Sequence, residues 1–365
     1  MKNKRLFIDI HAIQTLPPSN INRDDTGSPK SAQYGGVRRA RVSSQSWKKV
    51  IRDYFKENSE ASNLGVRTLN IVSYVAEKIQ KIDPSIGEDD AMNKAEKAIN
   101  DSFVRINADK KANALFFFGD RQAEKLAQAA IDGSNKKEIQ SILKNNLSID
   151  IALFGRMVAR EKKDDPSYLN VEASCQVAHS ISTHAVNQEF DYFTAIDELT
   201  GQQANAGASH IDTTEFNSST LYRYANIAIH DLKDQLGDKE ATIKTVALFI
   251  EAFTKSLPTG KVKSFANQTL PQLVLVSLRE DRPVNLVSAY EEPVKSKEGY
   301  VEKSIGKLFE EYAKVEKFVD KPIYTAFVST EQFDQENKEI LEKDSLRDLL
   351  ADIEGKLAEN LEDGE

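Results

Sequence analysis

The sequence has little cysteine and no long apolar run. Its single cysteine, Cys175, excludes an intrachain disulfide and any metal site built from several cysteines. No stretch approaches the roughly 20 apolar residues that a membrane-spanning helix requires. The basic residues among positions 1–5 lead into an alternating pattern, whereas a secretory signal would continue into an unbroken apolar segment. We therefore expect a cytoplasmic protein with no membrane partner.

Motifs of catalysis and of metal binding are missing as well. The histidines do not show the HExxH spacing of zinc proteases, and no serine lies in a GxSxG segment. His179 and His184, in the segment HSISTH, are expected to be structural hydrogen-bonding groups, because histidine is often partly buried. The sequence thus predicts no catalytic residue, no cofactor and no metal.

Two adjacent acids, Asp24 and Asp25, leave one alternative open. Neighbouring carboxylates in a loop can ligate magnesium. They can also cap turns or pair with nearby arginines, and a single pair of acids is a weak signal for a metal. We favour the turn-capping interpretation and keep the magnesium site as its rival.

Charge is distributed unevenly along the chain. The net charge of −8 would argue against a nucleic-acid partner, but residues 334–365 hold twelve acids and four bases and so account for all of it. Within the neutral remainder, residues 22–52 hold eight bases and two acids. We interpret this segment as a candidate phosphate-binding stripe. Its bases are Arg23, Lys30, Arg38, Arg39, Arg41, Lys48, Lys49 and Arg52.

The stripe runs across a predicted loop into a predicted helix. Residues 5–13 alternate like a strand, and the following thirty residues, with several prolines and glycines, predict a long ordered loop. Ser43 and Ser44 are suitable N-caps for a helix whose apolar face holds Trp47, Val50, Ile51, Tyr54 and Phe55. We expect the other face of this helix to point to solvent, with Gln45, Lys48, Lys49 and Arg52.

Residues 35–49, GGVRRARVSSQSWKK, combine three features that favour an anion. Two glycines allow the backbone to approach a ligand closely, arginines offer fork-shaped donors that match phosphate, and a helix N-terminus presents free N–H groups. A solvated charged loop is the alternative explanation of the charges. The capped helix that follows leads us to predict phosphate binding.

The rest of the pattern predicts an α+β fold. Residues 66–147 indicate a helical insertion, and Phe190–Phe216 indicates a hairpin arm around the flexible stretch Thr200–Ser209. On this arm, Tyr192 and Phe193 have two open roles, stacking on bases or core packing. Strands are predicted at residues 221–230, 272–279 and 322–329, and a helix at residues 240–257. This order suits a split βαβ, ferredoxin-like sheet of the kind that RNA-recognition modules use.

Six sequence blocks together resemble the CasC family, the RNA-binding backbone subunits (Cas seven) of the type I-E CRISPR Cascade complex. The blocks follow the family's order and span most of the chain. They are NRDD at 22–25, GGVRRARVSSQSWKK at 35–49, DIALFGRM at 150–157, HSISTH at 179–184, DYFTAIDE at 191–198 and TEFNSSTLYRYANI at 214–227.

The resemblance implies a hand-like subunit without chemistry of its own. Its palm is an RNA-recognition-type sheet at residues 1–60 and 220–365, with a helical fingers insertion at 61–180 and a hairpin thumb at 184–220. Several copies stack along one CRISPR RNA, and each thumb reaches the next copy and displaces a guide base, so that the guide pairs with target DNA in segments. The implied partners are CRISPR RNA, copies of the chain itself, other Cascade subunits and the target DNA strand.

The resemblance also implies roles for individual residues. Met157, Tyr192 and Phe193 match residues near the displaced nucleotide, and Lys136, Lys137 and Lys144 lie on a segment that meets target DNA. The loop after Met157 departs from the glycine- and methionine-rich version of the family. Guide-backbone contacts are implied for Arg23, Lys30, Ser43, Gln45, Lys48, Lys49 and Arg52.

Two rival functions follow from the same residues. The first is a metal-dependent ribonuclease like the backbone subunits of type III complexes, with Asp24 or Asp25 as the reactive carboxylate. The second is a stand-alone chaperone of single-stranded RNA, which would bind with a fixed 1:1 stoichiometry.

Overall fold

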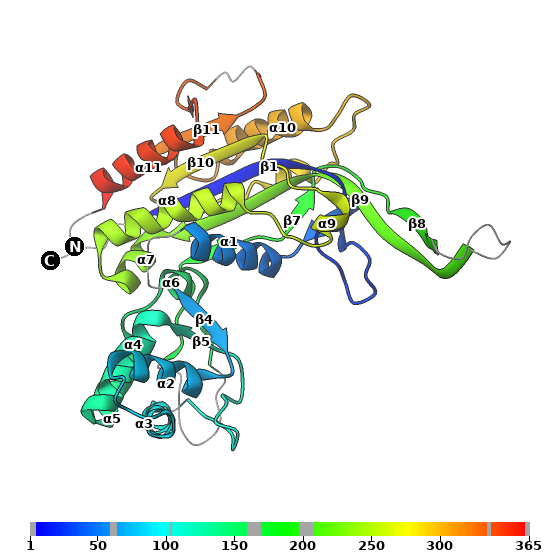
Figure 1. The fold of residues 1–365 in the computed structure, drawn as a ribbon. Coiled ribbons are helices and arrows are strands. Elements are labelled where there is room, and N and C mark those ends of the chain that lie inside the picture. Colours follow the sequence, from blue (N-terminus) through cyan, green and yellow to red (C-terminus); the bar gives the residue numbers. More distant parts are fainter. Residues whose placement is uncertain are drawn as a thin grey trace.

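A computed structural model describes residues 5–58, 64–102, 104–158, 169–196, 207–333 and 337–361 of the chain. The protein has three parts: a central sheet flanked by helices, which we name the palm, a helical lobe beside it, and a long two-stranded arm (Figure 1). The predicted α+β class, with a palm sheet, a helical insertion and a hairpin, is confirmed. None of the helices in the described ranges combines the length and the hydropathy of a membrane span.

The palm sheet is built on strand β1, Phe7–Ser19. β9, Gly207–Ala228, pairs antiparallel with β1 on one side, and β10, Leu273–Arg279, pairs antiparallel with it on the other. The order through the sheet is β12-β11-β10-β1-β9-β7-β3-β2, and β6 also pairs with β9. The outer strands are β2 (Ser31–Tyr34), β3 (Val37–Val42), β6 (Cys175–Val177), β7 (Ser180–Ser182), β11 (Tyr324–Ser329) and β12 (Leu341–Glu342).

Both faces of the palm sheet are buried, because alternate residues of a strand enter different cores. In β10, Val274 and Val276 join the core beneath the first helix, whereas Leu273 and Leu275 join a second core on the opposite face. The first face is covered by α1 (Ser44–Asn58), α7 (Ile229–Leu236), α8 (Lys239–Lys255) and α11 (Leu346–Asn360). The second face is covered by α10 (Val301–Val315) and the 3₁₀ helix η2 (Val287–Tyr290).

The predicted thirty-residue loop after the first strand is wrong in part. β1 continues to Ser19 through Pro17 and Pro18, because the pairing with β9 shifts register between Leu16 and Ser19 and so tolerates residues without an N–H donor. The later part of the segment forms the β2–β3 hairpin at the edge of the sheet. The loop that remains lies between β1 and β2.

The helical lobe has a hydrophobic core of its own, which includes Ile71, Val75, Phe118 and Leu126. The predicted helical insertion is confirmed, with one addition: β4 and β5 pair antiparallel as a separate two-stranded ribbon. The elements of the lobe are β4 (Gly65–Thr68), α2 (Ile71–Ile82), α3 (Glu88–Asp101), β5 (Phe116–Gly119), α4 (Asp120–Asp132) and α5 (Lys136–Lys144). Helix α6 (Ile149–Phe154) follows them, and most of its side chains belong to the palm core.

The arm consists of β8, Glu189–Ile196, and the first half of β9, and it projects from the palm (Figure 1). The register pairs Phe190 with Glu215 and Tyr192 with Thr213, as the hairpin prediction requires. Of the stretch predicted to be flexible, residues 200–206 lie outside the described ranges, and Gly207–Ser209 belong to β9.

Two long helices near the C-terminus were not predicted. α10 buries Ile305 and Leu308, and α11 buries Leu349, Ile353 and Leu357 at helical spacing. The apolar positions of α11 lie within a strongly acidic segment, so its helical pattern was not recognised. The strand predicted at residues 221–230 ends at Ala228, where α7 begins.

Candidate nucleic-acid interface

The β2–β3 hairpin turns through Gly35 and Gly36, whose φ angles are +58° and +74°. A two-residue turn with both φ angles positive matches the twist of a hairpin and favours glycine. A Cβ atom on Gly35 would lie 1.7 Å from the carbonyl oxygen of Glu291, so this glycine packs against the chain's own backbone. The prediction that both glycines admit a ligand is therefore wrong for Gly35, whereas Gly36 faces open space.

Arg38 and Arg39 follow the turn and point to opposite faces of β3. Arg38 is exposed, but the side chain of Arg39 is fully buried. Its guanidinium donates hydrogen bonds to the carbonyl oxygens of Tyr34 (3.1 Å), Ser182 (3.0 Å) and Tyr290 (2.7 Å). The burial of Arg39 thus speaks against its predicted contact with RNA, because its guanidinium joins the hairpin to the palm.

A second group of cations forms where the loop after β1 meets β3. The backbone N–H of Arg41 donates to the carbonyl oxygen of Lys30 (2.9 Å), and the Arg41 guanidinium donates to Nδ1 of His179 (3.1 Å). Burial, followed by the positive charges of Arg41 and Lys30, lowers the pKa of His179. A neutral His179 accepts the arginine hydrogen bond, so the structural interpretation of this histidine is confirmed, and Lys30 and Arg41 lie together. Arg23 is exposed on the same loop, next to its bridge with Pro29.

Ser43 places the start of α1 against this loop. Its backbone N–H donates to Oδ1 of Asn22 (2.9 Å), and its hydroxyl accepts a weak hydrogen bond from the N–H of Ser46 (3.4 Å). Ser43 is therefore a buried cap, and its predicted contact with RNA is not supported by its exposure. Gln45 is exposed in the first turn, which contains no acidic residue. A helix N-terminus without acids favours an approaching anion.

The three cations of α1 that were predicted to contact RNA, Lys48, Lys49 and Arg52, have different surroundings. The ammonium of Lys48 lies 5.5 Å from the centre of the Phe154 ring, and Lys49 is exposed and paired with Asp53 at 2.6 Å. Arg52 pairs with Asp150 at 3.0 Å, and its side chain is 13% exposed. The prediction that Arg52 points to solvent is wrong, because the helical lobe covers this part of α1.

The aromatic residues predicted near the displaced nucleotide are on the surface. Tyr192 is 62% exposed and Phe193 is 45% exposed on the arm, which rules out the core-packing alternative for both. Met157 is 88% exposed just after α6. The predicted DNA contacts Lys136, Lys137 and Lys144 are also exposed, but they lie on α5, at the outer end of the lobe away from the palm (Figure 1). The structure therefore does not join them to the cations of the palm.

Asp24 caps a turn. Its Oδ1 accepts hydrogen bonds from the N–H of Thr26 (2.9 Å), the hydroxyl of Thr26 (2.7 Å) and the N–H of Ser28 (3.1 Å). These bonds, led by that of the Thr26 hydroxyl, lower the pKa of Asp24. Within the described ranges, no three side chains of the His, Cys, Asp and Glu types are grouped to hold a metal. The turn-capping interpretation is confirmed for Asp24.

His184 is an interior hydrogen-bonding group. Its Nε2 accepts a hydrogen bond from the N–H of Thr220 (3.1 Å), and its ring stacks on Tyr300 with the centroids 3.7 Å apart. Burial lowers the pKa of His184, so the neutral ring is favoured. The structural interpretation of His184 is confirmed.

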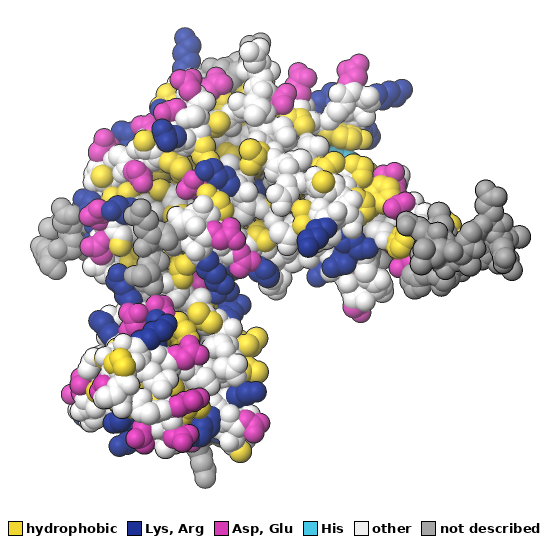
Figure 2. All heavy atoms as spheres, in the orientation of Figure 1, with side chains coloured by type: hydrophobic (Ala, Val, Ile, Leu, Met, Phe, Trp, Pro, Cys, Tyr) yellow, Lys and Arg dark blue, Asp and Glu magenta, His cyan; other side chains and the backbone are white. Residues whose placement is uncertain are grey.

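Exposed and half-buried cations thus gather along one edge of the palm. Figure 2 shows Lys and Arg side chains along this edge, between the helical lobe and the arm. The residues that the structure brings to the surface here come from the loop after β1, from β3 and from the first turns of α1. We name them the palm cations: Arg23, Lys30, Arg38, Arg41, Lys48 and Lys49.

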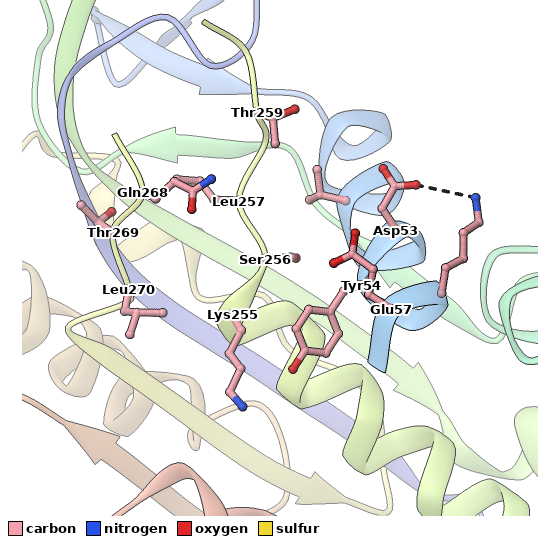
Figure 3. A pocket seen from close by; sticks show the side chains of 12 residues that line it. Asp53, Tyr54, Glu57, Lys255, Ser256, Leu257, Thr259, Gln268, Thr269 and Leu270 are labelled. Atoms are coloured by element: carbon pink, nitrogen blue, oxygen red, sulfur yellow. Dashed lines mark ion pairs between the residues drawn. The ribbon is translucent and has the colours of Figure 1, made fainter. Parts of the chain in front are cut away.

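A separate pocket of about 590 Å³ opens between α1, the end of α8 and the loop that follows (Figure 3). Its rim carries Asp53 and Glu57 together with Lys56 and Lys255. Asp53 pairs with Lys56 at 3.7 Å. Since its charges are mixed, this pocket does not extend the cationic edge.

Comparisons with known proteins agree in pointing to one group. A family model described as CT1975-like protein matches residues 8–352. A solved structure titled "CRISPR RNA-guided surveillance complex, pre-nicking" is 29% identical with a TM-score of 0.82, over 97% of this chain and 100% of that chain. A second, titled "CRISPR RNA-guided surveillance complex", is 26% identical with a TM-score of 0.64, with the same coverage of 97% and 100%. No curated protein matches.

Proposed function

Because the chain belongs to the family of CT1975-like proteins, we propose that it binds a CRISPR RNA guide along the sugar-phosphate backbone, as a subunit of an RNA-guided surveillance complex. The observation that carries the proposal is the gathering of the palm cations on one edge of a chain whose net charge is −8. More specifically, we propose that the chain is a CasC-type backbone subunit of a type I-E complex. This part of the proposal rests on the six sequence blocks that resemble the CasC family.

The palm cations suit a guide whose sequence varies. Lysine and arginine with a helix N-terminus bind phosphate and sugar, and such contacts fix the position of a strand without reading its bases. Sequence specificity then comes from base pairing between the guide and its target. A contact surface at the edge of a sheet, with helices packed behind it, holds the cations in place before RNA arrives.

The arm is the part of the chain that we propose to contact the next copy along the guide. Phe190 and Tyr192 are 64% and 62% exposed on this two-stranded projection. We propose that the arm reaches a neighbouring copy along the guide, that Tyr192, Phe193 and Met157 lie beside a displaced base, and that target DNA pairs in the segments between. Lys136, Lys137 and Lys144 remain proposed contacts of that DNA. In this assembly the palm, the helical lobe and the arm serve as palm, fingers and thumb.

RNA binding at several salt concentrations tests the role of the palm cations. Changing Arg38, Arg41 and Lys48 to glutamine together is expected to weaken binding about equally for guides of different sequence. The log–log salt dependence should flatten by about 0.7 for each phosphate that is no longer neutralised, which is about 2 for the three. A matched control removes three exposed charges elsewhere, at Lys94, Lys97 and Arg347. Equal slopes for the two triple variants would refute the proposed interface.

The arm is tested by deleting residues 200–209. The variant is expected to fold and to bind a short RNA, because the palm is intact, but to form no ordered multimers on a long guide. Electron microscopy of the particles provides the measurement. Multimers as regular as those of the full chain would contradict the role of the arm, and a fixed 1:1 stoichiometry of the full chain would favour the RNA chaperone.

We also propose that the subunit performs no chemistry, since Oδ1 of Asp24 accepts three hydrogen bonds within its own turn. Incubation of the assembled complex with complementary RNA and magnesium tests this. The RNA should stay intact, and cleavage that Asp24→Ala abolishes would establish the ribonuclease instead.

A further inference from the structure

The joint between the palm and the helical lobe contains a stack of two arginines on one aromatic ring. The guanidinium of Arg52, from α1, lies 4.5 Å from the centre of the Phe117 ring, and the guanidinium of Arg67, from β4, lies 4.6 Å from the same centre. Phe117 itself is buried on β5, directly opposite Arg67 in the ribbon. Each arginine gains a cation–π contact from this arrangement.

Arg52 is neutralised within the joint. Its Nε donates to Oδ2 of Asp150 at 3.0 Å, and a second guanidinium nitrogen donates to the carbonyl oxygen of Gly65 at 3.1 Å. Asp150 is buried and also accepts hydrogen bonds from the N–H of Gly65 (2.8 Å) and the hydroxyl of Ser148 (2.7 Å). This carboxylate is therefore committed to Arg52 and to the backbone around it.

Arg67 differs from Arg52 in having no acid to pair with among the residues that the structure describes. Arg67 is exposed, yet its guanidinium is partly desolvated. This desolvation, followed by the positive charge of Arg52, lowers the pKa of Arg67, and the charge of Asp150 acts in the opposite direction. The joint therefore holds two guanidinium groups and one carboxylate, which pairs with Arg52 alone, so one positive charge is in excess there. Such a surplus is unfavourable in the free protein unless an anion neutralises it.

The position of Arg67 continues the line of the palm cations. Lys48 and Arg52 are four residues apart on α1, so they lie on the same face, one turn apart. Lys48 lies over the ring of Phe154 in α6, and Arg52 lies over the ring that Arg67 covers from β4. Lys48, Arg52 and Arg67 thus follow one another from the palm to the helical lobe.

The ribbon continues beyond Arg67 into exposed apolar residues. One step beyond the last pair of the ribbon, Thr68 with Phe116, lie Leu69 and Leu115, which are 39% and 67% exposed. A fork-shaped donor beside a small apolar surface suits a nucleotide, whose phosphate is charged and whose sugar and base present flat or apolar faces.

We propose that Arg67 is a further nucleic-acid contact, which binds a phosphate of the single strand where it passes from the palm to the helical lobe. The proposal rests on the proposed function. It also reassigns Arg52, which holds the joint in place through Asp150 and the Phe117 ring and so acts as a positioning residue.

The test compares Arg67→Gln with Arg347→Gln, which removes an exposed arginine from α11. Binding of a single-stranded guide RNA is measured by fluorescence anisotropy from about 50 to 300 mM salt. Arg67→Gln should weaken binding about tenfold at the lower salt and flatten the log–log slope by about 0.7. Arg67→Lys, which keeps the charge but not the fork, should restore the slope and recover part of the affinity. Arg347→Gln should match the wild type in both.

The outcomes separate this proposal from the one that it rests on. If the wild type does not bind RNA, the proposed function fails. If the wild type binds and Arg67→Gln binds with the same affinity and slope, Arg67 does not touch the RNA, and the proposed function stands. If Arg67→Gln lowers the unfolding midpoint and leaves the slope unchanged, its role is structural stacking on Phe117, which also overturns the proposal. Arg52→Gln is expected to lower the unfolding midpoint, because it leaves Asp150 buried without its partner.

Discussion

The neighbouring residues Arg38 and Arg39 give the sharpest test of the structure. The sequence presents them as two equivalent cations, whereas the structure exposes Arg38 and buries Arg39 completely. We therefore expect substitutions at the two positions to affect different properties, RNA binding at Arg38 and stability at Arg39. Arg38→Gln should weaken RNA binding and leave the free energy of unfolding nearly unchanged, and Arg39→Met should do the reverse.

The magnitude for Arg39 follows from its partners. Methionine fills a similar volume but leaves the carbonyl oxygens of Tyr34, Ser182 and Tyr290 without their donor. A buried polar group without its hydrogen bond costs about 1–3 kcal/mol. Since a relaxed structure can admit water to some of these oxygens, we expect the free energy of unfolding to fall by about 3–6 kcal/mol. This is a large part of the roughly 5–15 kcal/mol that a domain has.

Urea unfolding, followed by intrinsic fluorescence, measures the first property of both variants. Guide-RNA binding across a salt series, at a temperature where Arg39→Met is folded, measures the second. The salt slope should flatten by about 0.7 for Arg38→Gln and stay at the wild-type value for Arg39→Met. An Arg39→Met protein of wild-type stability with a flattened slope would refute the buried assignment and restore Arg39 to the RNA surface.

Two further predictions concern stability. Burial raises the pKa of Asp9 to about 7 and lowers the pKa of His11 to about 3, so folding takes up a proton at Asp9 and releases one at His11 between about pH 4 and 6.5. As the pH rises through this window, the contribution of Asp9 to the free energy of unfolding falls and that of His11 rises, so the two changes offset each other. Asp9→Asn should uncover the His11 contribution as a free energy of unfolding that rises by up to about 1.4 kcal/mol per pH unit in this window, and a flat profile in urea titrations would contradict it. In the hairpin turn, Gly36→Ala should cost about 1–2 kcal/mol for its positive φ alone. Gly35→Ala should cost clearly more, because its methyl group meets the carbonyl of Glu291, and equal unfolding midpoints for the two would argue against that close approach.

Local patterns in the sequence were sufficient for most elements. The spacing of Trp47, Val50, Ile51 and Phe55 predicts α1, and all four are buried in it. The apolar run in residues 272–279 predicts β10, which is buried on both faces. The prediction missed α11, where Leu349, Ile353 and Leu357 show helical spacing within an acidic segment. The helical spacing of these leucine and isoleucine residues was present in the sequence, but the many acidic residues around them suggested a segment without a packed helix.

The candidate interface could be located from the sequence but not resolved into contacts. Arg38 and Arg39 alternate on a strand, and alternation alone does not say which of two faces is covered. Arg52 was placed off the apolar face of α1, where an isolated helix would expose it, but Phe117 of the helical lobe packs there and Asp150 of α6 pairs with it. No sequence pattern indicated a role for Arg67, because its partner Phe117 is distant in the sequence and becomes its neighbour only through the pairing of β4 with β5.

The sequence by itself determined where most of the chain is helical or extended and where its charge is concentrated, because both depend on residues that are neighbours along the chain. Only the tertiary structure decided which cations remain available to a ligand. Exposure and ion pairing depend on side chains that folding brings together from distant segments.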